Sequence, residues 1–144
     1  MRYHATNKLL PPSDSSEQIK QTWVFESHPL SELVDGNGNA REAKLLVKIL
    51  IGKIVCGKER FRYCLERVDV LQDTPEFTCR TWVREVVARI AGEGLLSNSS
   101  IIDWEVIEKE CRDYAGKKTD EGRFKQWTPT TPTYDLLVRK EIKP

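Results

Sequence analysis

The stretch PEFTCRTWVREVVARIAGEG, residues 75–94, predicts the element around which the fold is built. Its apolar residues recur with the spacing of a helix that packs one face against a core. They are Cys79, Trp82, Val83, Val86, Val87 and Ile90. Thr78 is suited to cap the start of this helix, and Gly92 and Gly94 are suited to end it. Cys79 therefore stands where a helix begins, which is one of the few places where a thiol becomes reactive.

Two interpretations of Cys79 follow from this position. Free cysteine is among the most buried residue types, and Cys64 and Cys111 occupy the apolar stripes of two other predicted helices in the same way. Only Cys79, however, lies in a first helical turn. Unpaired backbone N–H groups and the helix dipole favour a thiolate there, and Arg80 adds positive potential. The thiol is thus either part of the core or a nucleophile.

The rest of the chain shows strand patterns first, then helix patterns, then strands again. The expected elements are a short strand at 2–7, a loop at 8–22, a strand at 22–27, a turn at 34–40, a central strand at 44–55, helices at 58–67 and about 100–115, a loop at 116–133 and a last strand at 134–142. Gly52 indicates a bulge or a close approach of two backbones. Together these elements predict an α+β fold, an antiparallel sheet with helices packed on one face.

The bulk properties are those of an ordinary globular protein, and 144 residues are most simply one domain, 1–144. Lys and Arg number 23 against 22 Asp and Glu, which argues against a nucleic-acid partner. No apolar run is long enough to span a membrane, and residues 1–18 lack the apolar core of a signal peptide, so we expect a cytoplasmic protein. The four cysteines form no CxxC pair, so we expect free thiols, no metal site and no cofactor.

A reactive Cys79 would need a general base, which is usually a histidine brought near in space. The chain has two histidines. His4 lies in the predicted first strand, and His28 follows the second and precedes Pro29. The residues alone do not decide between them.

The segment TCRTWV, residues 78–83, resembles the N-C-x-x-[FW]-V signature of circularly permuted papain-like proteins, which include the lecithin:retinol acyltransferase-like and permuted NlpC-type groups. In these proteins a histidine on an early strand precedes a cysteine that opens a helix. His4 and Cys79 follow that order, although Thr78 stands where asparagine is common.

A longer resemblance is to an uncharacterised domain of filamentous fungi. It is carried by YHATN, WVFE, ILIGKIV, FTCRTWVREVVARI, DWEVIEKECRDYAGKK, GRF and YDLLVRKEIKP. Members of that domain usually begin with a further strand that carries a histidine–tryptophan pair, and this sequence starts after that point. If the missing histidine were the catalytic base, this protein would be inactive, or His4 would have to serve alone.

The papain-like resemblance implies a cysteine-dependent hydrolase or acyltransferase acting on an amide, thioester or ester bond. Cys79 would attack the carbonyl and His4 would take the proton, with Asn7, Glu26 or His28 as an orienting third residue. The alternative is a non-catalytic binding or regulatory module with a cleft for a small molecule, a peptide or a partner protein.

In that alternative, aromatic side chains could line the cleft together with Arg80. They are Trp23, Trp82, Trp104 and Trp127, of which Trp82 and Trp104 have the helical spacing of core residues. A third expectation is a structural or regulatory subunit that forms a homodimer, because the short N-terminus would leave a strand unpaired at a sheet edge.

Overall fold

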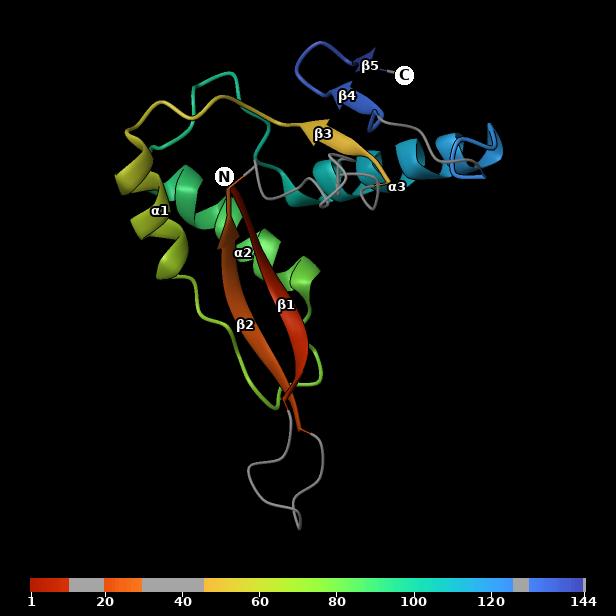
Figure 1. The fold of residues 1–144 in the computed structure, drawn as a ribbon. Helices are drawn as coiled ribbons and strands as arrows, with labels where there is room; N and C mark the ends of the chain where they lie inside the picture. The colour runs from red at the N-terminus through yellow and green to blue at the C-terminus, as the bar shows by residue number, and fades with distance from the viewer. Residues whose placement is uncertain (11–19, 30–45, 126–129, 144) are drawn as a thin grey trace. The chain divides into compact units, whose positions relative to one another are not determined.

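A computed structural model describes residues 1–10, 20–29, 46–125 and 130–143 (Figure 1). Strands and helices occur together, so the predicted α+β class is confirmed. The contacts fall into two compact units, the first made of Met1–Leu30 and Gly57–Glu93 and the second of Ser31–Cys56 and Gly94–Pro144. A single domain over 1–144 stays a prediction. The turn expected at 34–40, like Trp127, lies outside the described residues.

The first unit is built on an antiparallel pair of strands, β1 (Arg2–Leu10) and β2 (Lys20–His28). Both strands are longer than predicted, and the loop expected at 8–22 is wrong at both ends. The prolines that suggested this loop begin only at Pro11, so Lys8 and Leu9 can still pair with Thr22 and Gln21. The pairing therefore reaches from Arg2 opposite His28 to Leu10 opposite Lys20.

Two helices complete this unit, α1 (Lys58–Glu66) and α2 (Cys79–Gly92), both close to the predicted bounds. The cap of α2 is reciprocal. The Thr81 N–H donates to the Thr78 hydroxyl oxygen at 3.2 Å, and the Thr78 N–H donates to the Thr81 hydroxyl oxygen at 2.8 Å. After α2 the chain turns at Gly94, whose φ of 66° favours glycine.

The apolar stripe of α2 is confirmed only in part. Trp82, Val86, Val87 and Ile90 are buried, whereas Val83 is 39% exposed and Cys79 is also exposed. The residue that fills the core at this end of the helix is Phe77, which lies two positions before Cys79 and is buried. For this reason the first residue of the stripe stays outside the core.

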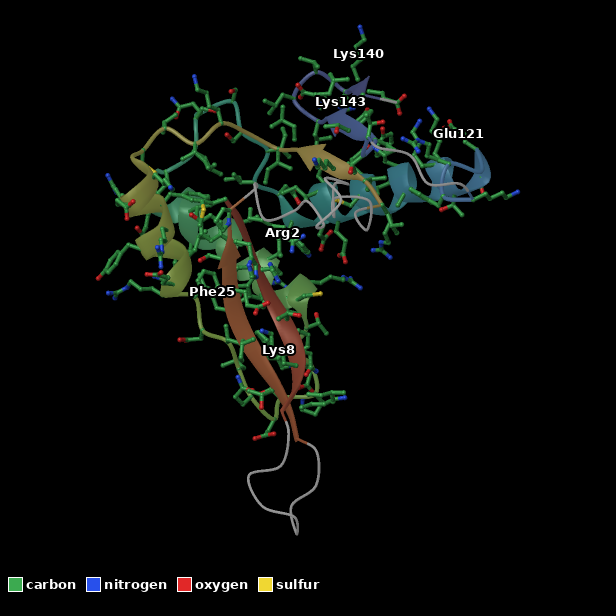
Figure 2. The ribbon with its side chains drawn as sticks, viewed as in Figure 1. Arg2, Lys8, Phe25, Glu121, Lys140 and Lys143 are labelled. Carbon is green, nitrogen blue, oxygen red and sulfur yellow. The ribbon has the colours of Figure 1, made fainter. Side chains whose placement is uncertain are left out.

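The alternation of side chains along the two strands gives the pair one apolar and one polar face. On the apolar face the ring of Tyr3 stands edge-on to Phe61 of α1, with centroids 6.0 Å apart, and Phe25 lies 5.7 Å from Trp82 of α2. The helices therefore cover this face, as predicted. The opposite, polar face carries Arg2, His4, Lys8, Glu26 and His28; Figure 2 labels Arg2 and Lys8 from this face and Phe25 from the other.

The second unit contains a small sheet of order β3-β4-β5, made of β3 (Lys48–Leu50), β4 (Thr133–Asp135) and β5 (Lys140–Lys143). β4 and β5 pair antiparallel, but β3 and β4 run parallel, so the prediction of an antiparallel sheet is wrong for this pair. The prediction of a central strand at 44–55 is wrong, because β3 is short and lies at the edge of this sheet. Beyond Leu50 the backbone pairs with residues 95–101 instead: the Ile101 N–H donates to the Ile51 carbonyl at 2.8 Å, and the Ser97 N–H donates to the Lys53 carbonyl at 2.9 Å.

This pairing confirms the close backbone approach expected at Gly52. A Cβ atom added to Gly52 would lie 2.1 Å from Oγ of Ser100. Only a residue without a side chain fits there.

The helix of the second unit, α3 (Trp104–Asp120), begins and ends later than predicted. Its cap is Asp103, whose carboxylate accepts the N–H groups of Glu105 and Val106 at 2.9 and 3.2 Å. The last strand expected at 134–142 is in fact two strands. The Asp135 carboxylate accepts the Leu137 N–H at 2.9 Å, which turns the chain back from β4 into β5.

A buried polar cluster joins α3 to β5. The Lys118 side chain is 5% exposed and its Nζ lies 2.6 Å from Glu141 and 2.8 Å from Glu121. The hydroxyl of Tyr114 donates to the same Glu141 carboxylate at 2.6 Å. These bonds explain why α3 continues past Gly116 into the region expected to be a loop.

Among the described helices, none is long and apolar enough to cross a membrane.

Candidate functional site

Cys79 is the first residue of α2, directly after the Thr78 cap, and is exposed. The predicted position at a helix start is therefore confirmed, and the interpretation of Cys79 as a core residue is wrong. Its neighbour Arg80 is exposed as well. All four cysteines lie in the described residues, and none of them forms a disulfide.

His4 lies in β1 directly opposite Glu26 of β2. Its Nε2 atom is 3.2 Å from Oε2 of Glu26, and Nε2 of His28 is 3.7 Å from the same oxygen. The two imidazole rings stack with centroids 5.5 Å apart. The other oxygen of Glu26, Oε1, forms an ion pair with Lys8. Two of the three residues expected to orient His4 thus lie beside it.

Asn7, the third of these residues, does not join this group. Its side chain alternates to the face opposite His4, and its amide donates to the side-chain oxygen of Gln21 at 3.4 Å.

The surroundings shift the pKa values of both His4 and Glu26. Burial lowers the pKa of His4 below its ordinary value, and the nearby charge of Arg2 lowers it further against the opposite effect of Glu26. The hydrogen bond from Lys8 is the main cause that lowers the pKa of Glu26. At neutral pH these shifts favour a neutral imidazole beside an ionised carboxylate.

The structure does not bring Cys79 and His4 together. The side chain of His4 lies on the polar face of the strand pair, whereas α2, which begins at Cys79, packs on the apolar face through Trp82 and Phe25. Within the described part of the chain, no hydrogen bond or ion pair links the two side chains. The sequence order of a permuted papain-like site is present, but the alternation of β1 directs the imidazole away from the helix.

The tryptophans expected to line a cleft are mostly structural. Trp82 is 2% exposed and lies under Phe25. Trp23 is half-buried, and its ring stands edge-on to Phe77 at 5.4 Å. Trp104, the first residue of α3, is half-buried and belongs to the second unit.

A groove of about 610 Å³ lies beside α2, at residues that the sequence did not single out. Buried Val68 and Phe77 contribute apolar surface, and exposed Leu71 and Ala88 extend it. The polar lining consists of Asp69, Thr74, Glu76, Thr81, Glu85 and Arg89. Neither Cys79 nor the polar-face histidines are among the lining residues.

Gln72 positions the segment 72–77, which supplies Thr74, Glu76 and Phe77 to the lining of the groove. Its side-chain amide donates to the Trp23 carbonyl at 2.7 Å and its oxygen accepts the Trp23 N–H at 3.0 Å, so it pairs with β2 as a further strand residue would. The Thr74 hydroxyl donates to the Gln72 carbonyl at 3.0 Å, and the Phe77 N–H donates to the Thr74 carbonyl at 3.0 Å. These bonds hold residues 72–77 in place against the strands.

The groove carries more negative than positive charge. Three carboxylates, of Asp69, Glu76 and Glu85, face a single guanidinium, and that guanidinium of Arg89 lies 3.7 Å from Glu93. One signal in the sequence points to this face. Thr81, Glu85, Ala88 and Arg89 recur with helical spacing on the side of α2 next to the apolar stripe.

Comparison with known families gives a match over nearly the whole chain. The model of a family of unknown function, DUF6914, matches residues 1–143. The chain belongs to this family. No curated protein and no solved structure matches it. The fold and the groove therefore have to be interpreted from their own chemistry.

Proposed function

We propose that this protein is a non-catalytic binding module whose groove beside α2 takes a small amphipathic organic cation. The observation that carries the proposal is the groove itself, which combines an apolar floor with carboxylates and has a volume typical of small-molecule sites. This interpretation is the binding alternative drawn from the sequence, with a different set of lining residues.

The apolar part of the ligand would pack against Phe77 and Val68, because these buried side chains offer the groove a dry surface. Its positive charge would lie near Glu85 and Glu76. The ring of Phe77 can also attract a cation through its face. An anionic ligand of the same shape would meet three carboxylates and only one guanidinium, so the groove selects by charge as well as by shape.

The experiment is a binding screen with ligands matched in shape. Aryl-alkyl amines, the corresponding neutral alcohols and the corresponding carboxylates are titrated into isotopically labelled full-length protein, and backbone amide shifts are followed by NMR. The proposal predicts that amines shift residues 68–89 and that alcohols bind more weakly. Carboxylates are expected to cause no shift there. Equal binding of all three classes, or shifts elsewhere only, would remove the proposal.

A thiol hydrolase or acyltransferase is the second candidate, and exposed Cys79 at a capped helix start supports it. It would require a base other than His4, since His4 lies on the far face of the strand pair. The papain-like resemblance and this activity stay predictions.

A further partner that we propose is a second copy of the chain. Gln72 occupies the outer edge of β2 at Trp23, so β1 would supply the edge for a homodimer through its own backbone groups. Light scattering across a concentration series tests this proposal, and a monomer throughout would remove it. We also propose that the protein acts in the cytoplasm.

A further inference from the structure

The polar face of the strand pair gathers two imidazoles and a carboxylate from positions far apart in the sequence. His4 and Glu26 are 22 residues apart along the chain but lie opposite each other, and His28 is the next residue of β2 on the same face. One ligand atom from each of the three residues lies within 4.8 Å of the other two. The three side chains are half-buried.

The geometry points to a binding site for a divalent zinc ion formed by His4, Glu26 and His28. Zinc is bound by imidazole nitrogen at 2.0–2.1 Å and by carboxylate oxygen at a similar distance, so two ligands of a tetrahedral ion lie about 3.3 Å apart. Here the Nε2 atoms of His4 and His28 lie 3.2 and 3.7 Å from Oε2 of Glu26. Small rotations of the side chains would admit the ion between them.

The chemistry of the three groups selects the class of metal. Two imidazoles and one carboxylate suit zinc and related transition metals, whereas calcium and magnesium prefer an all-oxygen shell. Three protein ligands leave a fourth position for water or an exogenous ligand. The site differs in this respect from closed structural zinc sites.

The residues around the three ligands also fit a metal. Lys8 pairs with Oε1 of Glu26, so the carboxylate is held in place while Oε2 remains directed at the imidazoles. From the sequence we expect no metal site, because the cysteines form no CxxC pair and the only histidines, His4 and His28, are far apart along the chain. Strand pairing supplies the proximity instead.

Isothermal titration of metal-free, full-length protein with zinc tests the site. Exposed Cys79 is itself a zinc ligand by type, so the parent protein for the test is Cys79→Ser. We expect one equivalent of zinc, and we expect each of His4→Gln, Glu26→Gln and His28→Gln to weaken binding at least about tenfold. Thr22→Val changes the same face without removing a metal ligand and serves as the control. Circular dichroism checks the fold of each variant.

Three readouts on the parent protein do not depend on the variants. Zinc should shift the imidazole nitrogen resonances of both His4 and His28, and cobalt bound in its place should show no thiolate charge-transfer absorption. Excess magnesium should not displace the zinc. The inference is overturned if the parent protein does not bind zinc, if the imidazole resonances do not move, or if the three variants bind as the parent does.

Discussion

At the scale of single residues, the structure separates Cys79 from His4, which the sequence suggested as a nucleophile and its base. Cys79 is exposed at the start of α2, and His4 is on the strand face that the helices do not cover. An exposed thiol can react without a histidine partner, because access is one of the factors that set its reactivity. Its reactivity should therefore not depend on His4.

Alkylation with iodoacetamide, followed by mass spectrometry of each cysteine, measures this independence. We expect Cys79 to be modified in the native protein at least about tenfold faster than buried Cys64, because Cys79 is exposed and access to the thiol limits the rate. Cys111 should also react slowly, since burial raises the pKa of its thiol. The rate at Cys79 should be the same in His4→Gln. Slower modification in that variant would show that the imidazole acts on the thiol after all.

At the scale of elements, the close approach at Gly52 shows how one residue permits the pairing of two segments. The backbone of residues 51–55 pairs with residues 95–101, and the Ser100 side chain occupies the space where a side chain of residue 52 would be. Gly52→Ala should lower the free energy of unfolding by about 2 kcal/mol through this overlap. Urea unfolding followed by fluorescence measures the change.

Two variants make this prediction specific. Ser100→Gly removes the overlapping Cβ and Oγ atoms, so it should recover part of the loss, with a coupling of about 1 kcal/mol in the double-mutant cycle. Gly116 lies within α3, and a Cβ atom added to it meets nothing within 4 Å. Gly116→Ala should therefore raise stability by about 0.5–1 kcal/mol. A loss at both glycines would show that the effect of Gly52→Ala has no steric origin.

The helices were predictable from the sequence because their signals are local. The cap at Thr78, the buried residues from Trp82 to Ile90 and the helix at 58–67 depend on spacing within a few residues. The bounds of the strands were not predictable, since the length of a strand depends on a partner far away in sequence. Lys8 belongs to β1 because Thr22 pairs with it. β3 ends before Ile51 because the Ile51 carbonyl accepts the N–H of Ile101 instead. The same holds for the sites. Strand register brings His28 to His4, and Gln72 ties the groove segment to Trp23.

At the scale of the whole molecule, the cluster of Lys118, Glu141 and Tyr114 links stability to pH. Lys118→Met would leave Glu141 without its main partner, and we expect a loss of about 2 kcal/mol, as for hydrogen bonds to charged groups. Neighbouring Lys117 is exposed and 3.8 Å from Glu121. Lys117→Met should therefore change stability by less than about 0.5 kcal/mol.

The sign of the pH dependence follows from Glu141. Its pKa is lowered in the folded protein, first by the hydrogen bond from Lys118 and then by that from Tyr114. The carboxylate thus contributes stability above its ordinary pKa, and this contribution is lost as the pH falls toward the lower folded value. The difference in stability between the natural protein and Glu141→Gln should be largest near pH 7 and should shrink below about pH 4. Chemical unfolding at a series of pH values measures it, and a constant difference would contradict this account.

The central claim is that the groove beside α2 binds a small amphipathic cation, and the affinity for an aryl-alkyl amine across three proteins tests it most directly. Ala88→Leu fills the groove, and Arg84→Leu places the same side chain at an exposed position of α2 outside the lining. The account predicts that the natural protein and Arg84→Leu bind the amine equally, while Ala88→Leu binds at least about tenfold more weakly. Equal affinity of all three proteins would contradict it.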